Sequence, residues 1–464
     1  MNEADWAINE FGGAGLGDTR RTDRLVWAAT VLGEHPRESL PAACTDPAML
    51  KGVYRLLENP EVRPEAMLAS HVQATLERVS AVPVVWAVQD TTELDYSQRR
   101  ATTGLGAIGN GFGRGLEVHS TLALTPDHIP QGVLAQAVWT RDPATTGKKH
   151  QRKQRPISEK ESQKWLTGLA ALNALAPQCP ATQFISVADR EADMYELLCA
   201  ERAPNVALLV RATQNRSVAR VSGAVGPLRA TLLAQPVGAT RQIVVPRQAT
   251  HPARTATVWL RWATHTFQPP AHRPPGQLAA VTLGVVWAHE DCPPAGVKGL
   301  DWLLLTTLAI SDQAAAVRCL TYYACRFGIE VWHRTLKTGC AIEARQLASR
   351  AALQRGLALY SVVAWRLLYA ALLARVTPDV PCTVLLEEAE WQALFCYQHH
   401  TTQVPARPPT LAQAVRGIAT LGGFLGRKGD GEPGPTVLWR GFQRLADLTA
   451  MFHVCAPPPL FLVP

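Results

Sequence analysis

The sequence predicts an α/β protein with a strand-rich centre and helical regions at both ends. Apolar residues recur at helical spacing through the first eighty residues, short apolar runs of the buried-strand type begin at Val82, and helical patterns return from Gln313 onward. At 464 residues the chain is also too long for one hydrophobic core, since single cores stop growing at roughly 250 to 300 residues. We therefore expect a helical domain over 1–80, an α/β domain over 81–375 and a helical region over 376–464.

The composition predicts a folded protein with a surplus of positive charge. Hydrophobic residues make up 47% and charged residues 18%, which is enough apolar surface for a packed core and too little charge for a disordered chain. The net charge of +8 attracts polyanions such as nucleic acid or anionic lipid, but charge alone does not choose between them.

The ten cysteines include no C-x-x-C pair, so a zinc site of that kind is excluded and a reduced compartment is favoured. The first residues lack the pattern of a secretory signal, and we expect a cytoplasmic protein.

The N-terminal region reads as helices separated by prolines. Helical spacing covers Thr22–Leu32 and Glu65–Val79, and Pro36, Pro41 and Pro64 mark the breaks. This region also carries four basic residues: Arg20, Arg21, Arg24 and Arg55. They fit either phosphate contacts or an ordinary solvated helix face, and charge alone favours the second.

Strands begin after residue 82. The run Val84–Val88 has the apolarity of a buried strand and ends beside Asp90. Two further runs, Val118–Leu124 and Gly132–Trp139, are separated by a Pro-Asp-His turn. We expect three consecutive strands, with the second and third joined as a hairpin.

A second acid follows another buried strand. A basic stretch at 148–156 leads into a helix expected over Ser158–Ala174, with Ser158 and Glu161 as a capping box. The next apolar run, Phe184–Ala188, ends at Asp189. Carboxylates at the carboxyl ends of strands face the crevice in which α/β proteins place their sites.

The rest of the chain predicts a β-rich insertion followed by long helices. Residues from about 205 to 300 alternate β-type runs with Pro-rich breaks, and the pattern is helical over 313–336 and 350–375. The segment Gly356–Ala374 approaches the length and apolarity of a membrane span. Because Arg366 lies at its centre, a buried core helix is the favoured interpretation, and we expect no membrane association.

A third acid lies on a polar helical stripe. Tyr323, Arg326, Glu330 and Lys337 fall along one face at 3.6 residues per turn. Two divalent metal ions held about 4 Å apart can cleave a phosphodiester, and they need such carboxylates as ligands. Basic side chains on the same face would contact the phosphate. Mg²⁺ is the ion that hard oxygen ligands favour. The alternative is an exposed helix face with an Arg326–Glu330 ion pair.

Taken together, these motifs resemble the bacterial cut-and-paste transposases of the DDE type, specifically the insertion-sequence-four family and its transposon-five branch. The likeness rests on Asp-Thr-Thr at 90–92, Asp-Arg-Glu-Ala-Asp at 189–193 and the Y-x2-R-x3-E-x6-K signature at 323–337. It extends to 16–21, 54–55, 59–60 and 421–424, and so covers nearly the whole chain.

The resemblance implies an RNase H-like catalytic core interrupted by a β insertion, a helical N-terminal DNA-binding domain and a C-terminal dimerisation region. It implies that Asp90, Asp189 and Glu330 bind Mg²⁺, for which Mn²⁺ substitutes. The implied phosphate contacts are Tyr323, Arg326 and Lys337. A homodimer would synapse two transposon ends, cleave them through a hairpin intermediate and join them to target DNA, acting at the bacterial nucleoid.

Two further positions complete the expected site. By the same resemblance Trp302 stacks on a flipped base and Arg211 belongs to the active site, although a core Trp and a solvated strand-end Arg remain the alternatives. His119 and His333 have no partners at metal spacing, and we assign them no role. Phe327 and Gly328 depart from the pattern, the first where close relatives often have Trp, the second as a weak helix former.

Two other functions stay open at this point. A transposase-derived regulator would bind DNA without cutting it, and an RNase H-like nuclease would hydrolyse DNA without joining it. The three intact acids argue against the regulator. Only strand-transfer products separate the nuclease from the transposase.

Overall fold

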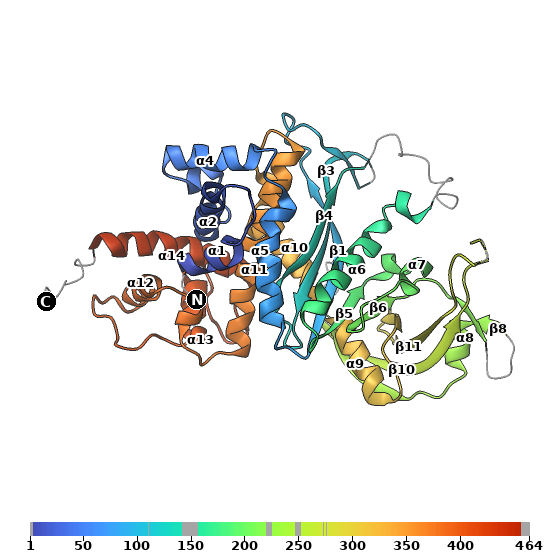
Figure 1. Cartoon of the computed structure of the whole chain (residues 1–464). Helices are drawn as coiled ribbons and strands as arrows, with labels where there is room; N and C mark the ends of the chain where they lie inside the picture. The colour runs from blue at the N-terminus through green and yellow to red at the C-terminus, as the bar shows by residue number, and fades with distance from the viewer. Residues whose placement is uncertain are drawn as a thin grey trace.

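The computed structural model describes residues 3–109, 111–141, 156–219, 225–245, 252–271, 273–274 and 276–455. Figure 1 shows a central sheet with the helices of both chain ends gathered against one face and α6 on the other. The predicted basic stretch lies outside the described residues except for Pro156. The expected fold class, an α/β core with helical regions at both ends, is confirmed.

The N-terminal region is helical as predicted, and local signals explain where its helices start. Asp18 accepts a hydrogen bond from the N–H of Arg20, and Asp46 accepts from those of Ala48 and Met49, so both acids cap helix starts. Pro47 and Pro64 stand at the first helical positions, where a missing N–H costs nothing. The helices are α1 Glu3–Phe11, α2 Thr19–Glu34, α3 Leu40–Ala43, α4 Pro47–Glu58 and α5 Pro64–Val79.

The sheet combines antiparallel and parallel strands. Its first strands are β1 Val84–Asp95, β2 Gly106–Ile108, β3 Gly113–Leu124, β4 Pro130–Trp139, β5 Gln183–Ala188 and β6 Val206–Arg211. β4, β3 and β1 are antiparallel neighbours, and β1, β5 and β6 are parallel neighbours. This order, β4-β3-β1-β5-β6, is the RNase H-like arrangement. The three expected strands are present as β1, β3 and β4, and the last two form the expected hairpin, but the strands are not consecutive because the short strand β2 lies between β1 and β3 in the chain.

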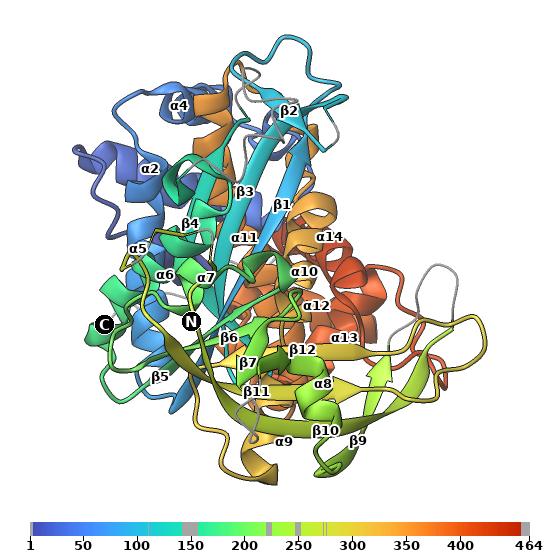
Figure 2. The ribbon, with the colours of Figure 1, turned by 90° about the vertical axis from the view of Figure 1, so that its right-hand side faces the viewer.

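The β-rich insertion extends this sheet. β12 (Asp301–Thr306) pairs antiparallel with β6, and β11 (Val281–His289), β10 (Arg254–Phe267) and β9 (Ala239–Val245) follow in order. Figure 2 shows these strands continuing and curving away from β6. The prediction of strands is confirmed, but they form no separate sheet, because β12 satisfies the free main-chain groups at the edge of β6. Beside them lie β7 Ser217–Ala219, β8 Val225–Pro227 and α8 Leu228–Leu233.

The long apolar helix α11 (Arg350–Val376) is the centre of the helical side. By length and composition it is the one helix in the described residues that could cross a membrane, but 83% of its most apolar window is buried inside the fold. It packs against α2, α4, α5, α13, α14 and β4. The guanidinium carbon of Arg366 lies 4.7 Å from the ring centre of Trp6 in α1. A buried core helix is therefore confirmed.

The C-terminal region is helical as expected. Its helices are α12 Glu388–His399, α13 Leu411–Leu421 and α14 Pro435–Cys455. Capping boxes start two of them, formed by Glu387 with Glu390 and by Thr410 with Gln413. They pack on each other and on α11, so the two ends of the chain share one helical layer (Figure 1).

Two expected helices differ in the structure. α6 begins at Gln163 and runs to Leu175, because Glu161 pairs with Arg141 (Nε to Oε1, 2.6 Å) and forms no capping box with Ser158. The helix expected over 313–336 is broken into α9 (Gln313–Ala324) and α10 (Phe327–Arg334), followed by a π-helical turn over 335–339. A short helix α7 covers Tyr195–Leu198.

Candidate active site

The first two acids stand level with each other on neighbouring strands. In the parallel register of β1 and β5, Val88 lies opposite Val187, and each acid comes two residues later. Asp189 follows the end of β5 as predicted. Asp90 does not end its strand: β1 continues to Asp95 because it stays paired with β3. The two carboxylates therefore emerge where the β1–β5 ladder stops.

The third acid comes from the broken helix pair that crosses this point. Tyr323 lies in the last turn of α9, Glu330 lies in α10 and Lys337 lies in the π-helical turn. The break falls at Arg326, where the N–H of Arg326 bonds the carbonyl of Tyr323 three residues back. A single straight stripe was therefore a wrong expectation, although its four residues still reach the same region.

Gly328 has a packing reason in this structure. A Cβ at this position would lie 2.7 Å from the Cδ1 of Leu124, a buried residue of β3. The absence of a side chain lets α10 lie directly on the sheet, which brings Glu330 toward Asp90. The weak helix former noted in the sequence is thus a close-approach position.

Arg326 lies among the three acids. Its Nη1 is 3.7 Å from Oδ2 of Asp90, and its Nη2 bonds Oε1 of Glu330, so the ion pair with Glu330 considered from the sequence does form. Burial raises the pKa of Asp189, and the charge of Arg326 partly opposes this rise. Within the described part of the chain, no group of three or more Asp, Glu, His or Cys side chains is gathered closely enough to hold a metal ion. Instead, the guanidinium occupies the space between the carboxylates.

The donor set itself suits a hard divalent cation. It consists of carboxylate oxygens, and three acids carry more negative charge than one guanidinium neutralises. Burial raises the pKa of Asp90 to about 6, and Asp189 and Glu330 add to this rise while Arg326 and the N–H of Thr91 oppose it. Burial also raises the pKa of Asp189. Both shifts arise chiefly from burial, which disfavours the ionised carboxylates, and a bound cation would stabilise that ionised form.

Asp90 should therefore lower the stability of the metal-free fold at neutral pH. Its pKa is higher in the folded chain than the ordinary 3.8, so the folded state loses stability as the pH rises from about 4 to 6 and regains none above that range. A pKa raised from 3.8 to about 6 corresponds to a loss of at most about 3 kcal/mol in the free energy of unfolding. We predict that Asp90→Asn unfolds at higher urea than the parent at pH 8 in EDTA.

The same comparison at low pH serves as the control. Near pH 4 both side chains are neutral, and the two unfolding curves should converge. An Asp90→Asn chain that is no more stable than the parent at pH 8 would show that Asp90 is well solvated or fully neutralised.

Two cavities adjoin the acids. The smaller one, of about 350 Å³, opens between β1 and α10 and is lined by Asp90, Thr91, Thr92, Glu330, His333, Arg334, Lys337 and Thr338. It combines two of the acids with two cations, Arg334 and Lys337. A backbone phosphate that reacts at a metal site needs acids that bind the metal on one side and basic side chains on the other, and this cavity offers both.

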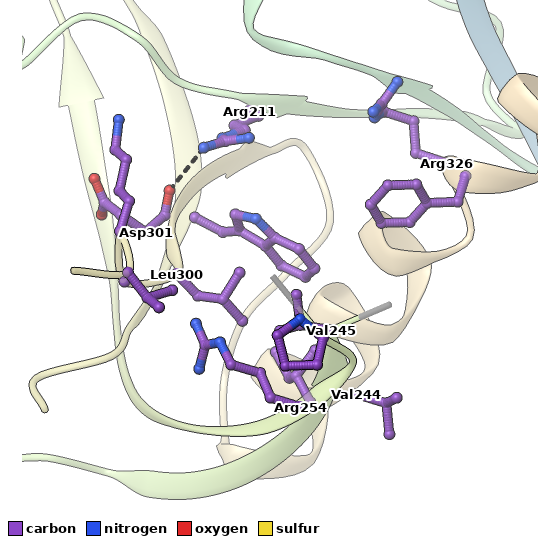
Figure 3. Close-up of a pocket in the computed structure, with 14 residues that line it drawn as sticks. Arg211, Val244, Val245, Arg254, Leu300, Asp301 and Arg326 are labelled. Atoms are coloured by element: carbon purple, nitrogen blue, oxygen red, sulfur yellow. Dashed lines mark hydrogen bonds between the residues drawn. The ribbon is translucent and has the colours of Figure 1, made fainter. Parts of the chain in front are cut away.

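The larger cavity, of about 600 Å³, lies between the end of the insertion and the helix break. Its charged wall is Arg211, Arg254, Lys298, Asp301 and Arg326, and its apolar wall includes Trp302, Phe327, Leu300 and Val244. Figure 3 shows Arg211 and Arg326 on one side of this space and Arg254 on the other, with Arg211 bonded to the carbonyl of Asp301 at 3.0 Å. Arg326 belongs to both the acid cluster and this cavity.

Trp302, which lines this cavity, contacts the tyrosine of the 323–337 signature. The ring of Trp302, at the second position of β12, packs edge-on against Tyr323 with centroids 5.2 Å apart. Burial raises the pKa of Tyr323 despite nearby Arg326 and Arg211. The structure therefore brings Trp302, Arg211, Tyr323 and Arg326 together, as the sequence-based site required. Lys337 lies in the smaller cavity, with its Nζ 3.8 Å from Oε1 of Glu343.

The four N-terminal arginines lie elsewhere, in α2 and α4 on the far side of α11 (Figure 1). Arg20 is exposed and pairs with Asp18, and Arg55 is also exposed. Arg21 bonds Glu61 and the carbonyl of Leu16, and Arg24 contacts the sulfur of Met49. Their role in DNA binding stays a prediction.

Two residues near the acids were given no role from the sequence. His333 lines the smaller cavity with its Nδ1 3.9 Å from Asp90 Oδ2, and its spacing of three residues from Glu330 on α10 was the available signal. Burial lowers its pKa to about 3, so the ring is neutral. Asp193 is buried and accepts hydrogen bonds from the N–H groups of Thr213 and Gln214, which anchors the loop after β6.

Two family models match the ends of this chain. One, described as transposase DNA-binding, matches residues 3–62, and the other, described as transposase Tn5 dimerisation domain, matches residues 362–453. With the RNase H-like sheet between them, these matches support a transposase that has a DNA-binding domain and a dimerisation domain. Since the C-terminal model is that of Tn5, the matches support a Tn5-like transposase.

Proposed function

We propose that this chain is a DDE-type, cut-and-paste DNA transposase of the insertion-sequence-four family. The observation that carries the proposal is that Arg326 pairs with Asp90 and Glu330 close to Asp189, beside a cation-lined cavity that contains Trp302. An RNase H-like sheet with a transposase DNA-binding domain supplies the context.

In this proposal the three acids hold Mg²⁺, or Mn²⁺ in its place. The bound ions would polarise the attacking oxygen and stabilise the leaving oxygen of a phosphodiester. Arg326 would leave the acids and turn to the DNA, since its guanidinium is shared with the larger cavity. Lys337 would hold a backbone phosphate in the smaller cavity.

The larger cavity would hold the end of the DNA. Arg211, Arg254 and Lys298 supply positive charge for phosphates, and Trp302 offers an aromatic face to an unstacked base. Such an unstacked base would allow the tight backbone turn of a hairpin intermediate. Two copies would synapse two ends before joining them to target DNA.

The test uses linear DNA carrying the inverted repeats that flank the chain's own gene, incubated with Mg²⁺ or EDTA and read on a denaturing gel. Hairpinned ends and joined products, seen only with Mg²⁺, are the expected result. Binding without any cut product would identify a regulator, and cut ends without joined products would identify a nuclease. Either outcome removes the proposal.

A further inference from the structure

A chain of buried polar side chains crosses the sheet directly behind the acid cluster. Gln89 and Thr91 flank Asp90 on β1, His119 lies on β3 and Ser186 lies on β5. Because side chains alternate along a strand, Gln89 and Thr91 point away from Asp90, toward the face that α6 covers. Gln89, His119 and Ser186 are each at most 2% exposed.

The hydrogen bonds among these buried polar side chains show which atom of each pair donates. Nε2 of Gln89 donates to Oγ of Ser186 at 2.9 Å, so the carbonyl oxygen of Gln89 faces His119. That oxygen lies 3.1 Å from Nε2 of His119, which must therefore carry the hydrogen. Nδ1 of His119 then accepts from the hydroxyl of Thr91 at 2.9 Å. Burial lowers the pKa of His119 to about 3, in keeping with this neutral ring.

The polar side chains lie where main-chain pairing between the two acid-bearing strands ends. The last register pair of β1 and β5 is Val88 with Val187, after which β5 ends at Ala188 while β1 continues to Asp95. The Gln89–Ser186 bond is a side-chain link at the end of this ladder, and it ties β1 to β5 one residue before Asp90 and three residues before Asp189. His119 extends the link to β3, which holds the other edge of β1.

The packing of α6 holds this link in place. Gly168 of α6 lies so close to Gln89 that a Cβ would overlap its amide group. Trp165, also on α6, packs edge-on against His119 with ring centroids 4.6 Å apart. The amide and the imidazole are thus confined on the side away from the acids.

We propose that His119, Gln89 and Thr91 are positioning residues that set the separation of Asp90 and Asp189 for the binding of a divalent cation. This inference rests on the proposed function, since it gives the two acids a shared ion. Partners that orient metal ligands from behind commonly change metal affinity by ten- to a hundredfold when removed. None of the three touches the reacting atoms.

The test compares His119→Phe with the parent chain, each bound to a duplex carrying its own transposon end. Phenylalanine keeps the ring against Trp165 but removes both nitrogens. We expect the affinity for Mn²⁺, measured by calorimetry, to fall about ten- to a hundredfold. The affinity for the duplex in EDTA should stay within about twofold, because no DNA contact is changed.

Two further variants separate positioning from general stability. Thr121→Val is the matched control, because Thr121 is a buried residue of β3 whose hydroxyl has no hydrogen-bond partner among the described residues. It should leave Mn²⁺ affinity unchanged. His119→Gln keeps a donor toward Gln89 and should recover part of the affinity. Thr91→Val added to His119→Phe should cause little further loss, since both interrupt the same chain.

Three outcomes would overturn the inference. One is parent-like Mn²⁺ affinity in His119→Phe. Another is an equal loss in His119→Phe and Thr121→Val, which would indicate a purely structural role. The third is Mg²⁺-dependent cleavage by Asp189→Ala, which would remove the proposed function and this inference together.

Discussion

Asp189→Ala is expected to abolish Mg²⁺-dependent cleavage of transposon ends while leaving end binding in EDTA intact. The proposal gives this carboxylate a bound cation, which contributes several kcal/mol of charge stabilisation in phosphoryl transfer. A loss of about 4 kcal/mol corresponds to roughly a thousandfold in rate. Asp189 also accepts the N–H of Glu191 at 2.8 Å, so its carboxylate is already oriented at the end of β5. Single-turnover cleavage on a denaturing gel measures the effect.

The neighbouring acids provide matched controls. Glu191 is exposed and pairs only with Lys164 at 3.5 Å, so Glu191→Ala should cleave within a few-fold of the parent. Asp193→Ala should instead lower the free energy of unfolding, because Asp193 anchors the loop after β6 and pairs with Arg216 at 2.5 Å. If Asp189→Ala cleaved as well as Glu191→Ala, the catalytic assignment would be wrong.

Glu10→Gln is expected to cause the largest loss of stability among single polar substitutions in the N-terminal region. Glu10 is fully buried and contacts Nδ1 of His71 and Nη1 of Arg78, each at 2.5 Å. Arg78 also stacks 4.4 Å from the ring centre of Trp365, and His71 accepts the N–H of Val133. This cluster joins α1, α5, α11 and β4. Removing one charge of a buried pair typically costs about 3 to 5 kcal/mol, since its partner stays buried.

The pH dependence follows from the same cluster. Burial alone would raise the pKa of Glu10, but His71 and Arg78 lower it below its ordinary 4.5. Burial lowers the pKa of His71 below 6.5, and the bond from Val133 keeps its Nε2 free of a proton. In both cases the unfolded chain binds protons first as the pH falls. Stability contributed by His71 should therefore decline below about pH 6.5, and that contributed by Glu10 below about pH 4.5.

Glu61→Gln is the matched control for this prediction. It removes the same charge from the same region, but Glu61 is 70% exposed where it pairs with Arg21, so the cost should stay below about 1 kcal/mol. Urea unfolding of both variants at pH 7 and pH 5 measures the difference. Equal stability of the two variants would mean that Glu10 is not part of a buried ion pair in solution.

Local sequence patterns predicted much of the secondary structure of this protein. Helical spacing and proline breaks located α2 and α5, helical spacing located α11, and short apolar runs located β1, β3, β4 and β5. These features are local, because each depends on the burial of one face or on one turn of backbone hydrogen bonds. The acid after β5 and the spacing of the 323–337 signature were likewise readable from the chain. The assignment of a function to them came from resemblance to a known family.

Long-range pairing decided the features that the local patterns missed. The insertion became part of the main sheet because β12 covers the edge of β6, and β1 ran past Asp90 because β3 remained beside it. The helix expected over 313–336 is broken at Arg326, and α10 then lies directly on the sheet because Gly328 packs on Leu124, a contact between residues about two hundred positions apart.

The arrangement of the site also depended on tertiary structure. The types and the spacing of the residues in the sequence were enough to identify the acids and cations of the site. Only the fold placed Arg326 between the acids, gathered Arg254 and Lys298 at the same cavity as Trp302, and joined His119 to Gln89 behind Asp90. The physical reason is that charge balance, burial and hydrogen-bond direction depend on neighbours in space, and strand register and helix packing choose those neighbours.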